Sequence, residues 1–209
     1  MRKIIIAGGG GFARELLSWA IACMETTGDL TIIGYADDAG PMMSGYSGIS
    51  IPYLGRIVDL VLDDVEIALA VGEPASKKAV DLSLADRGAR FASLIHPSAQ
   101  VARDAHLAEG VVIGPLTYVA TNSALGRLAS VNSLSGIGHD AQVGTYATIS
   151  SQVDIMGGVD LDEGVFVGSG ARILPKIKVG AAARIGAGAI VVRTVKAGQT
   201  IFSAPARSL

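Results

Sequence analysis

The stretch IGPLTYVATNSALGRLASVNSLSGIGHDAQV, residues 113–143, carries an aliphatic side chain at every sixth position. The same spacing runs without a break from residue 95 to residue 191, which makes seventeen consecutive hexads. The fifth place of each hexad is almost always Ala, Val, Ser or Thr. A period of six matches neither the repeat of an amphipathic helix nor the alternation of a half-buried strand. A short strand followed by a tight turn fits it, and a repeat of this length predicts a solenoid whose units bury their apolar sides against their neighbours.

Three flat sides of six residues close one triangular coil of 18 residues, so seventeen hexads predict nearly six coils of a parallel β-prism. The aliphatic and the small residue of each hexad are expected to point into the prism. The other four residues point outward or form the corner. Residues 18 apart in the sequence then lie one above another, and this stacking predicts which side chains meet on the surface.

The first ninety residues follow a different pattern, in which short apolar runs alternate with amphipathic segments. The pattern predicts strands at residues 3–7, 31–35, 66–71 and 91–95, and helices at residues 12–24, 56–62 and 74–86. Alternating strands and helices are typical of a small parallel α/β sheet. The sequence therefore predicts two domains, a Rossmann-like nucleotide-binding domain at residues 1–92 and a β-helix domain at residues 93–209.

A glycine-rich turn follows the first expected strand. Gly8, Gly10 and Ala13 match the fingerprint GxGxxG/A between a strand and a helix. Such glycines let backbone N–H groups approach a phosphate, and Asp37 and Asp38 end the next strand, where a carboxylate can reach a ribose or a base. A plain tight turn is the alternative interpretation of the glycines. The domain is too short for both halves of a full dinucleotide fold, which favours a mononucleotide such as the UDP end of a sugar nucleotide over NAD.

The composition argues against several classes of partner. A net charge of −2 and a pI of about 5.9 give no basic footprint for nucleic acid. No uncharged apolar run approaches the ~18 residues of a membrane span, and Arg14 and Glu15 interrupt the N-terminal run that faintly resembles a signal peptide. The single cysteine, Cys23, excludes an internal disulfide and is typical of a cytoplasmic protein. The sequence contains no metal-ligand cluster, so we expect no metal.

Among the three histidines, His139 is the one best placed for chemistry. It is the third residue of the hexad IGHDAQ, residues 137–142, so it is expected to point out of the prism beside Asp140. The 18-residue stacking places Gly157 and Gly158 above this pair. Two glycines there leave a slot beside the imidazole, with backbone N–H groups that can hold an acyl carbonyl. A plain surface histidine is the alternative.

The segment VNSLSGIGHDAQVGTYATISSQVDIMGGV, residues 131–159, resembles the hexapeptide-repeat sugar acyltransferases, of the nucleotide-amino-sugar N-acetyltransferase and sialic-acid O-acetyltransferase type. The motifs IIIAGGGGFARE at residues 4–15, GYADD at 34–38 and IFSAPAR at 201–207 resemble the same family. Together they cover nearly the whole chain. The resemblance implies a left-handed parallel β-helix, a handedness that the spacing alone does not determine.

The resemblance also implies residue roles. His139 corresponds to the general base of the family, and Asp140 to the acid that orients or polarises it. Some members carry a second histidine nine residues later, near the thioester; Thr148 stands there in this chain, and its hydroxyl can still donate to a carbonyl. The remaining implied roles are contacts with substrates: Asn132 near the sugar, Gly8, Gly10, Asp37 and Asp38 at the nucleotide, and Gly157 and Gly158 at acetyl-CoA.

These roles lead to a functional hypothesis. The chain is expected to move an acetyl group from acetyl-CoA to the amine of a UDP-, GDP- or dTDP-linked 4-amino-deoxy sugar, for bacterial surface glycan biosynthesis. The family implies a homotrimer that holds acetyl-CoA between neighbouring prisms. Two alternatives stay open: a sugar or sialic-acid O-acetyltransferase, and a non-catalytic β-helix scaffold. Basic residues on the later coils fit either CoA phosphates or a solvated face, namely Arg172, Lys176, Lys178 and Arg184.

Overall fold

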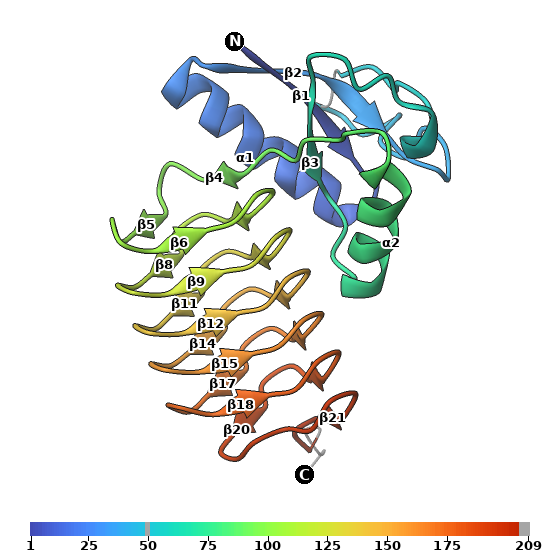
Figure 1. Cartoon of the computed structure of the whole chain (residues 1–209). Coiled ribbons are helices and arrows are strands. Elements are labelled where there is room, and N and C mark those ends of the chain that lie inside the picture. The colour runs from blue at the N-terminus through green and yellow to red at the C-terminus, as the bar shows by residue number, and fades with distance from the viewer. Residues whose placement is uncertain (49–50, 205–209) are drawn as a thin grey trace.

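The computed structural model describes residues 1–48 and 51–204, and it consists of a small α/β domain on top of a β-prism (Figure 1). The predicted fold class, a Rossmann-like parallel domain followed by a left-handed parallel β-helix, is confirmed. The last three residues of the IFSAPAR motif, 205–207, lie outside the described residues.

The N-terminal domain is built on a three-stranded parallel sheet with the order β2-β1-β3. Its elements are β1 (Arg2–Ala7), α1 (Gly11–Thr27), β2 (Leu30–Ala36), η1 (Ile57–Asp59), β3 (Glu66–Leu69) and α2 (Pro74–Ala85). Side chains of β1 alternate between two cores: Ile4 and Ile6 pack with α1, whereas Ile5 packs with Leu84 of α2. The helix α1 ends at Gly28, whose φ of 65° lets its N–H bond to the carbonyl of Met24 at 3.0 Å.

Two of the predicted elements are wrong in extent. The expected helix at residues 56–62 is a single 3₁₀ turn, because Leu60 leaves the helical region with a ψ of 139°. Ile57 and Leu60 are both buried and lie three residues apart, so their spacing resembles that of a helix although only one turn forms. The expected strand at residues 91–95 is only β4 (Leu94–Ile95), although Phe91 forms an isolated bridge with Ile67.

The prism consists of two-residue strands on three faces. Face 1 contains β4, β7 (Val112–Ile113), β10 (Ser130–Val131), β13 (Thr148–Ile149), β16 (Phe166–Val167), β19 (Arg184–Ile185) and β21 (Thr200–Ile201). Face 2 contains β5 (Gln100–Val101), β8 (Tyr118–Val119), β11 (Gly136–Ile137), β14 (Asp154–Ile155), β17 (Arg172–Ile173) and β20 (Ile190–Val191). Face 3 contains β6 (His106–Leu107), β9 (Ala124–Leu125), β12 (Gln142–Val143), β15 (Asp160–Leu161) and β18 (Lys178–Val179).

The parallel register confirms that residues 18 apart are stacked. Ile137, for example, pairs with Val119 on one side and with Ile155 on the other. The aliphatic hexad residues from Ile113 to Val191 fill one continuous buried core. Ile95, the first of the series, is an exception with 39% of its surface exposed, because no coil covers the open end of the prism above it.

Helix α2 attaches the N-terminal domain to the side of the prism through polar contacts on three coils. Asp81 accepts hydrogen bonds from Arg127 at 2.8 and 3.1 Å and from the Tyr146 hydroxyl at 2.7 Å. Burial favours a higher pKa for Asp81, but these hydrogen bonds outweigh it and lower the pKa. Lys78 pairs with Glu163. The two domains therefore form a single packed body with a shared boundary along face 1.

Candidate active site

His139 and Asp140 occupy the corner between β11 and β12. The Nδ1 atom of His139 lies 2.7 Å from Oδ2 of Asp140. Asn122, one coil below, donates from Nδ2 to Oδ1 of Asp140 at 2.6 Å. The hydrogen bond from His139 and then the one from Asn122 lower the pKa of the Asp140 carboxyl, so this group is an acceptor at neutral pH. An ionised partner at Nδ1 fixes the hydrogen on that nitrogen and leaves Nε2 with its lone pair free.

Gly157 lies directly over the imidazole. A Cβ atom at Gly157 would be 2.5 Å from Nε2 of His139, which is too close for any real contact. The backbone hydrogen bonds show the same stacking of the two coils, since the Gly158 N–H donates to the His139 carbonyl at 2.8 Å. Gly158 has a different role, since its φ of 68° belongs to the left-handed corner conformation that Asp140 also adopts with φ 61°. Only Gly157 therefore creates the slot predicted beside the histidine.

The glycine turn after β1 is shaped partly by packing. Gly8 has φ 124°, and a Cβ there would lie 2.7 Å from the carbonyl oxygen of Ala70. Gly10 meets nothing within 4 Å and begins α1 with no side-chain cap. The first N–H groups of α1 are therefore open to an incoming anion.

The acidic pair at the end of β2 is anchored to this turn. Asp37 accepts the Gly9 N–H at 2.6 Å through Oδ2 and the Ala39 N–H at 2.7 Å through Oδ1. Asp38 accepts the Ile57 N–H at 3.0 Å, and its side chain remains half exposed. The structure thus brings Asp37 against the glycine turn through Oδ2, whereas Oδ1 of Asp37 is used within its own loop after β2.

A cavity of about 400 Å³ lies where the two domains meet. Its upper wall is the start of α1 and the loop after β3, and its lower wall is face 1. The lining residues are Gly11, Phe12, Glu15, Gly72, Glu73, Ser130, Asn132, Thr148, Ser150, Phe166 and Arg184. We call it the junction pocket. Within the described chain, the Oδ1 atom of Asn132 is the single buried side-chain oxygen or nitrogen without a hydrogen-bond partner, so this wall presents an unused acceptor.

The structure therefore brings the candidate residues together in two groups. Asn132 and Thr148 line the junction pocket beside the start of α1. His139, Asp140 and Gly157 lie at the corner beyond face 2, and none of them lines that pocket. Within one chain, the candidate base and the candidate sugar-binding residue do not share a cavity.

Sequence reasoning missed the contacts of several residues around the junction pocket and at the His139 corner. Lys77 is only 1% exposed, although a lysine on an amphipathic helix is normally solvated and gives no sign of burial. Arg184 was a candidate for CoA phosphates, but it pairs with Glu73 of the other domain at 2.7 and 3.1 Å and stacks over Phe166. The 18-residue stacking could have identified Asn122, because this residue lies 18 positions before Asp140.

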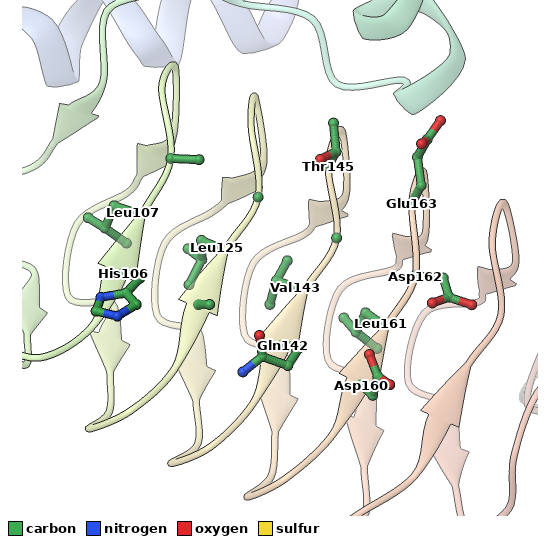
Figure 2. Close-up of a pocket in the computed structure, with 14 residues that line it drawn as sticks. His106, Leu107, Leu125, Gln142, Val143, Thr145, Asp160, Leu161, Asp162 and Glu163 are labelled. Carbon is green, nitrogen blue, oxygen red and sulfur yellow. The ribbon is translucent and has the colours of Figure 1, made fainter.

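A larger groove of about 620 Å³ runs along face 3 (Figure 2). Figure 2 shows His106, Gln142 and Asp160 on one open face, with the strand of Leu125 between those of His106 and Gln142. Two of its three acids have basic partners, since Lys178 lies 3.8 Å from Asp160 and Lys78 lies 2.7 Å from Glu163. Among the described residues, no carboxylate is paired with His106 in the way that Asp140 is paired with His139.

Residues 1–48 and 51–204 contain no group of three His, Cys, Asp or Glu side chains that could hold a metal ion. In the same part of the chain, neither helix combines the length and the apolar character that a membrane span requires.

Comparison with known proteins adds a family context to this geometry. Residues 3–81 match the PglD N-terminal domain family. The whole chain is similar to perosamine N-acetyltransferase from Caulobacter crescentus, solved as a point mutant with CoA and GDP-perosamine, with a TM-score of 0.86 and 26% identity over 99% of this chain and 96% of that one. A search of curated proteins by sequence found no significant match.

Two further solved structures have the same two-domain architecture. The acetyltransferase domain of PglB from Neisseria gonorrhoeae, in complex with acetyl coenzyme A, has a TM-score of 0.86 and 26% identity over 100% of this chain and 99% of that one. WeeI from Acinetobacter baumannii shares the fold at 22% identity, with a TM-score of 0.85 and full coverage of both chains.

Proposed function

We propose that this chain, which resembles the hexapeptide-repeat sugar acetyltransferases, moves an acetyl group from acetyl-CoA to the amine of a nucleotide-linked 4-amino-deoxy sugar. The observation that carries the proposal is the corner of the prism, where Asp140 holds His139 with Nε2 facing a glycine that has no Cβ. An imidazole oriented in this way by a carboxylate is arranged to accept a proton. Family and geometry together favour an enzyme over a scaffold.

In the proposed reaction, the amine nitrogen attacks the thioester carbonyl carbon while Nε2 of His139 takes a proton from that nitrogen. Asp140 stabilises the imidazolium that forms. The tetrahedral intermediate then collapses, the C–S bond breaks, and the CoA sulfur leaves with the proton that His139 returns. The backbone at Gly157 and Gly158 is proposed to contact the acetyl-CoA, with the N–H of Gly157 as the donor, because the Gly158 N–H is already bonded to the His139 carbonyl.

The nucleotide is proposed to bind the α/β domain, residues 1–92. The uncapped start of α1 at Gly10 offers N–H groups and the positive end of the helix dipole to the phosphates. Asp38 retains an exposed carboxylate for the ribose or base. Asp37 supports the site by holding Gly9, and Gly8 lets the turn pass against Ala70. This geometry favours a phosphate site over a plain turn.

Residues 93–209 are proposed to bind acetyl-CoA, and the sugar is proposed to reach the junction pocket. There Asn132 supplies the unused Oδ1 acceptor for an amine or hydroxyl hydrogen, and Thr148 supplies a hydroxyl near the acyl group. We infer that the chain works as a homotrimer, because a neighbouring prism can bring its own His139 corner to this pocket, whereas the pocket and that corner are separate within one chain. Such a protein would act in the cytoplasm in bacterial surface glycan biosynthesis.

A transfer assay tests the acceptor class. The protein is incubated with radiolabelled acetyl-CoA and a panel of UDP-, GDP- and dTDP-linked sugars that carry either a 4-amino or a 4-hydroxy group. Label in the amino sugars alone is the expected result. Label in hydroxyl acceptors or sialic acid would replace the proposal with an O-acetyltransferase, and the absence of both turnover and CoA binding would favour a scaffold.

A further inference from the structure

Lys77 is a buried cationic side chain to which the proposed reaction gives no role. It lies on the face of α2 that packs against face 1, and it is 1% exposed. Its Nζ donates to Oγ of Ser130 at 2.7 Å and to the carbonyl of Ala147 at 3.0 Å. Burial lowers the pKa of Lys77 to about 7, and the negative charge of Glu73 partly opposes this. A group this costly to bury normally has a specific task.

The contacts of Lys77 lead into the junction pocket. Ser130 accepts from Nζ, and its own hydroxyl hydrogen points to Oγ1 of Thr148 at 3.5 Å, the long end of the hydrogen-bonding range. Both hydroxyl groups are nearly buried, and both residues line the pocket. Because Oγ1 of Thr148 accepts from Ser130, the hydrogen of Thr148 is left to donate into the pocket.

We propose that Lys77 is a positioning residue: through Ser130 it turns the Thr148 hydroxyl so that it donates a hydrogen bond to the acetyl carbonyl oxygen in the junction pocket. The idea rests on the proposed acetyl transfer. Nζ has two acceptors, Oγ of Ser130 and the Ala147 carbonyl, and in its protonated form it has no lone pair and must donate, which directs the chain from Nζ to Oγ to Oγ1. Without Lys77, the Ser130 and Thr148 hydroxyls can rotate, and the carbonyl loses a donor that is oriented before the reaction starts.

The surroundings of Lys77 are consistent with this direction. On α2 it is flanked by Glu73 one turn before and Asp81 one turn after, and both acids are already paired, with Arg184 and Arg127 respectively. No carboxylate among the described residues forms an ion pair with Nζ. The hydrogen bonds of Lys77 are therefore directed to the prism wall and to the pocket behind it.

The test compares steady-state rates of Lys77→Met, Thr148→Val and the double variant, with Lys78→Met as the control because Lys78 is an exposed neighbour on the same helix. Methionine fills the buried volume without a polar group. We expect Lys77→Met to lower kcat about 10-fold with both KM values within twofold of wild type, since an indirectly held donor contributes less than the ~10²-fold of a direct one. The double variant should have the kcat of Thr148→Val alone.

A purely structural lysine would give a different pattern. It would lower the melting temperature and the folded fraction while leaving kcat per folded molecule near wild type, and that result would overturn the proposal. The proposal would also be overturned if the fold-losses in kcat of Lys77→Met and Thr148→Val multiply in the double variant, because the two residues would then act independently. If Lys77→Met does not fold, Ser130→Ala breaks the same chain, and the same non-additivity with Thr148→Val is required. If the wild-type protein shows no turnover, both the proposed function and this role of Lys77 are wrong. If wild type is active and Lys77→Met has the same kcat, only the role of Lys77 is wrong.

Discussion

At the scale of single residues, the hexad register predicted the surroundings of His139 because the 18-residue stacking is a property of the backbone. Gly157 lies over the imidazole as the register requires, and Asp140 binds Nδ1. The register could not distinguish Gly157 from Gly158. One glycine makes room for a side chain and the other relieves a left-handed φ, and only three-dimensional contacts separate these causes.

Gly157→Ala tests the slot. The new Cβ would push against the His139 ring, and a displacement of about 1 Å in a reacting group is enough to lower kcat by about 10²-fold. The backbone of Gly157 tolerates alanine, so the melting temperature should change little. Gly136→Ala is the matched control, because a Cβ there comes no closer than 3.8 Å to any atom. Equal rates for the two variants would refute the role of the slot.

At the scale of elements, the predicted helices and strands are correct where their apolar spacing is long and fail where it is short. The pattern of α1 extends over several turns and is confirmed, whereas residues 56–62 offer two apolar anchors and form one 3₁₀ turn. The burial of Lys77 was not predictable, because α2 alone does not show which coil will cover it. Packing between elements decides such cases.

The lowered pKa of Lys77 gives α2 a pH-dependent effect on stability. The folded state holds this proton only below a pKa of about 7, while the unfolded chain holds it up to the usual lysine pKa of 10.5. Between these values the unfolded state binds more protons, so the free energy of unfolding rises with pH, by at most about 1.4 kcal/mol per unit.

Thermal unfolding between pH 6.5 and 8.5, at one protein concentration, checks this effect. The wild-type melting temperature should rise with pH relative to that of Lys77→Met, which has lost the titrating group but keeps Glu73, Asp81 and Tyr146. Parallel curves for the two proteins would show that Lys77 keeps an ordinary pKa in the folded state.

At the scale of the whole molecule, the sequence predicted the two-domain architecture because repeats and alternating elements are long-range patterns. The hexad register places Asn132 and His139 about one face apart, but it could not show that a pocket would enclose Asn132 without His139. The docking of α2 on face 1 creates the junction pocket, and no local pattern encodes that contact. This separation is the reason for proposing an active site that is shared between copies.

Subunit mixing tests the shared site. His139→Ala and Asn132→Ala chains, each inactive alone, are unfolded together and refolded. If each site takes Asn132 from one copy and His139 from the next, random cyclic trimers should recover about a quarter of wild-type activity. If both residues act within one chain, the mixture should remain as inactive as the separate variants. Sedimentation of the same samples verifies that trimers form.

The role of His139 as acceptor of the amine proton is tested by the single-turnover rate of His139→Ala with acetyl-CoA and the amino-sugar nucleotide that wild type prefers. His106→Ala, which removes an exposed histidine from face 3, is the control. We expect the rate of His139→Ala to fall by ~10²–10⁴-fold, with CoA binding and melting temperature retained and His106→Ala unchanged. A rate for His139→Ala near that of wild type would show that His139 is not the base.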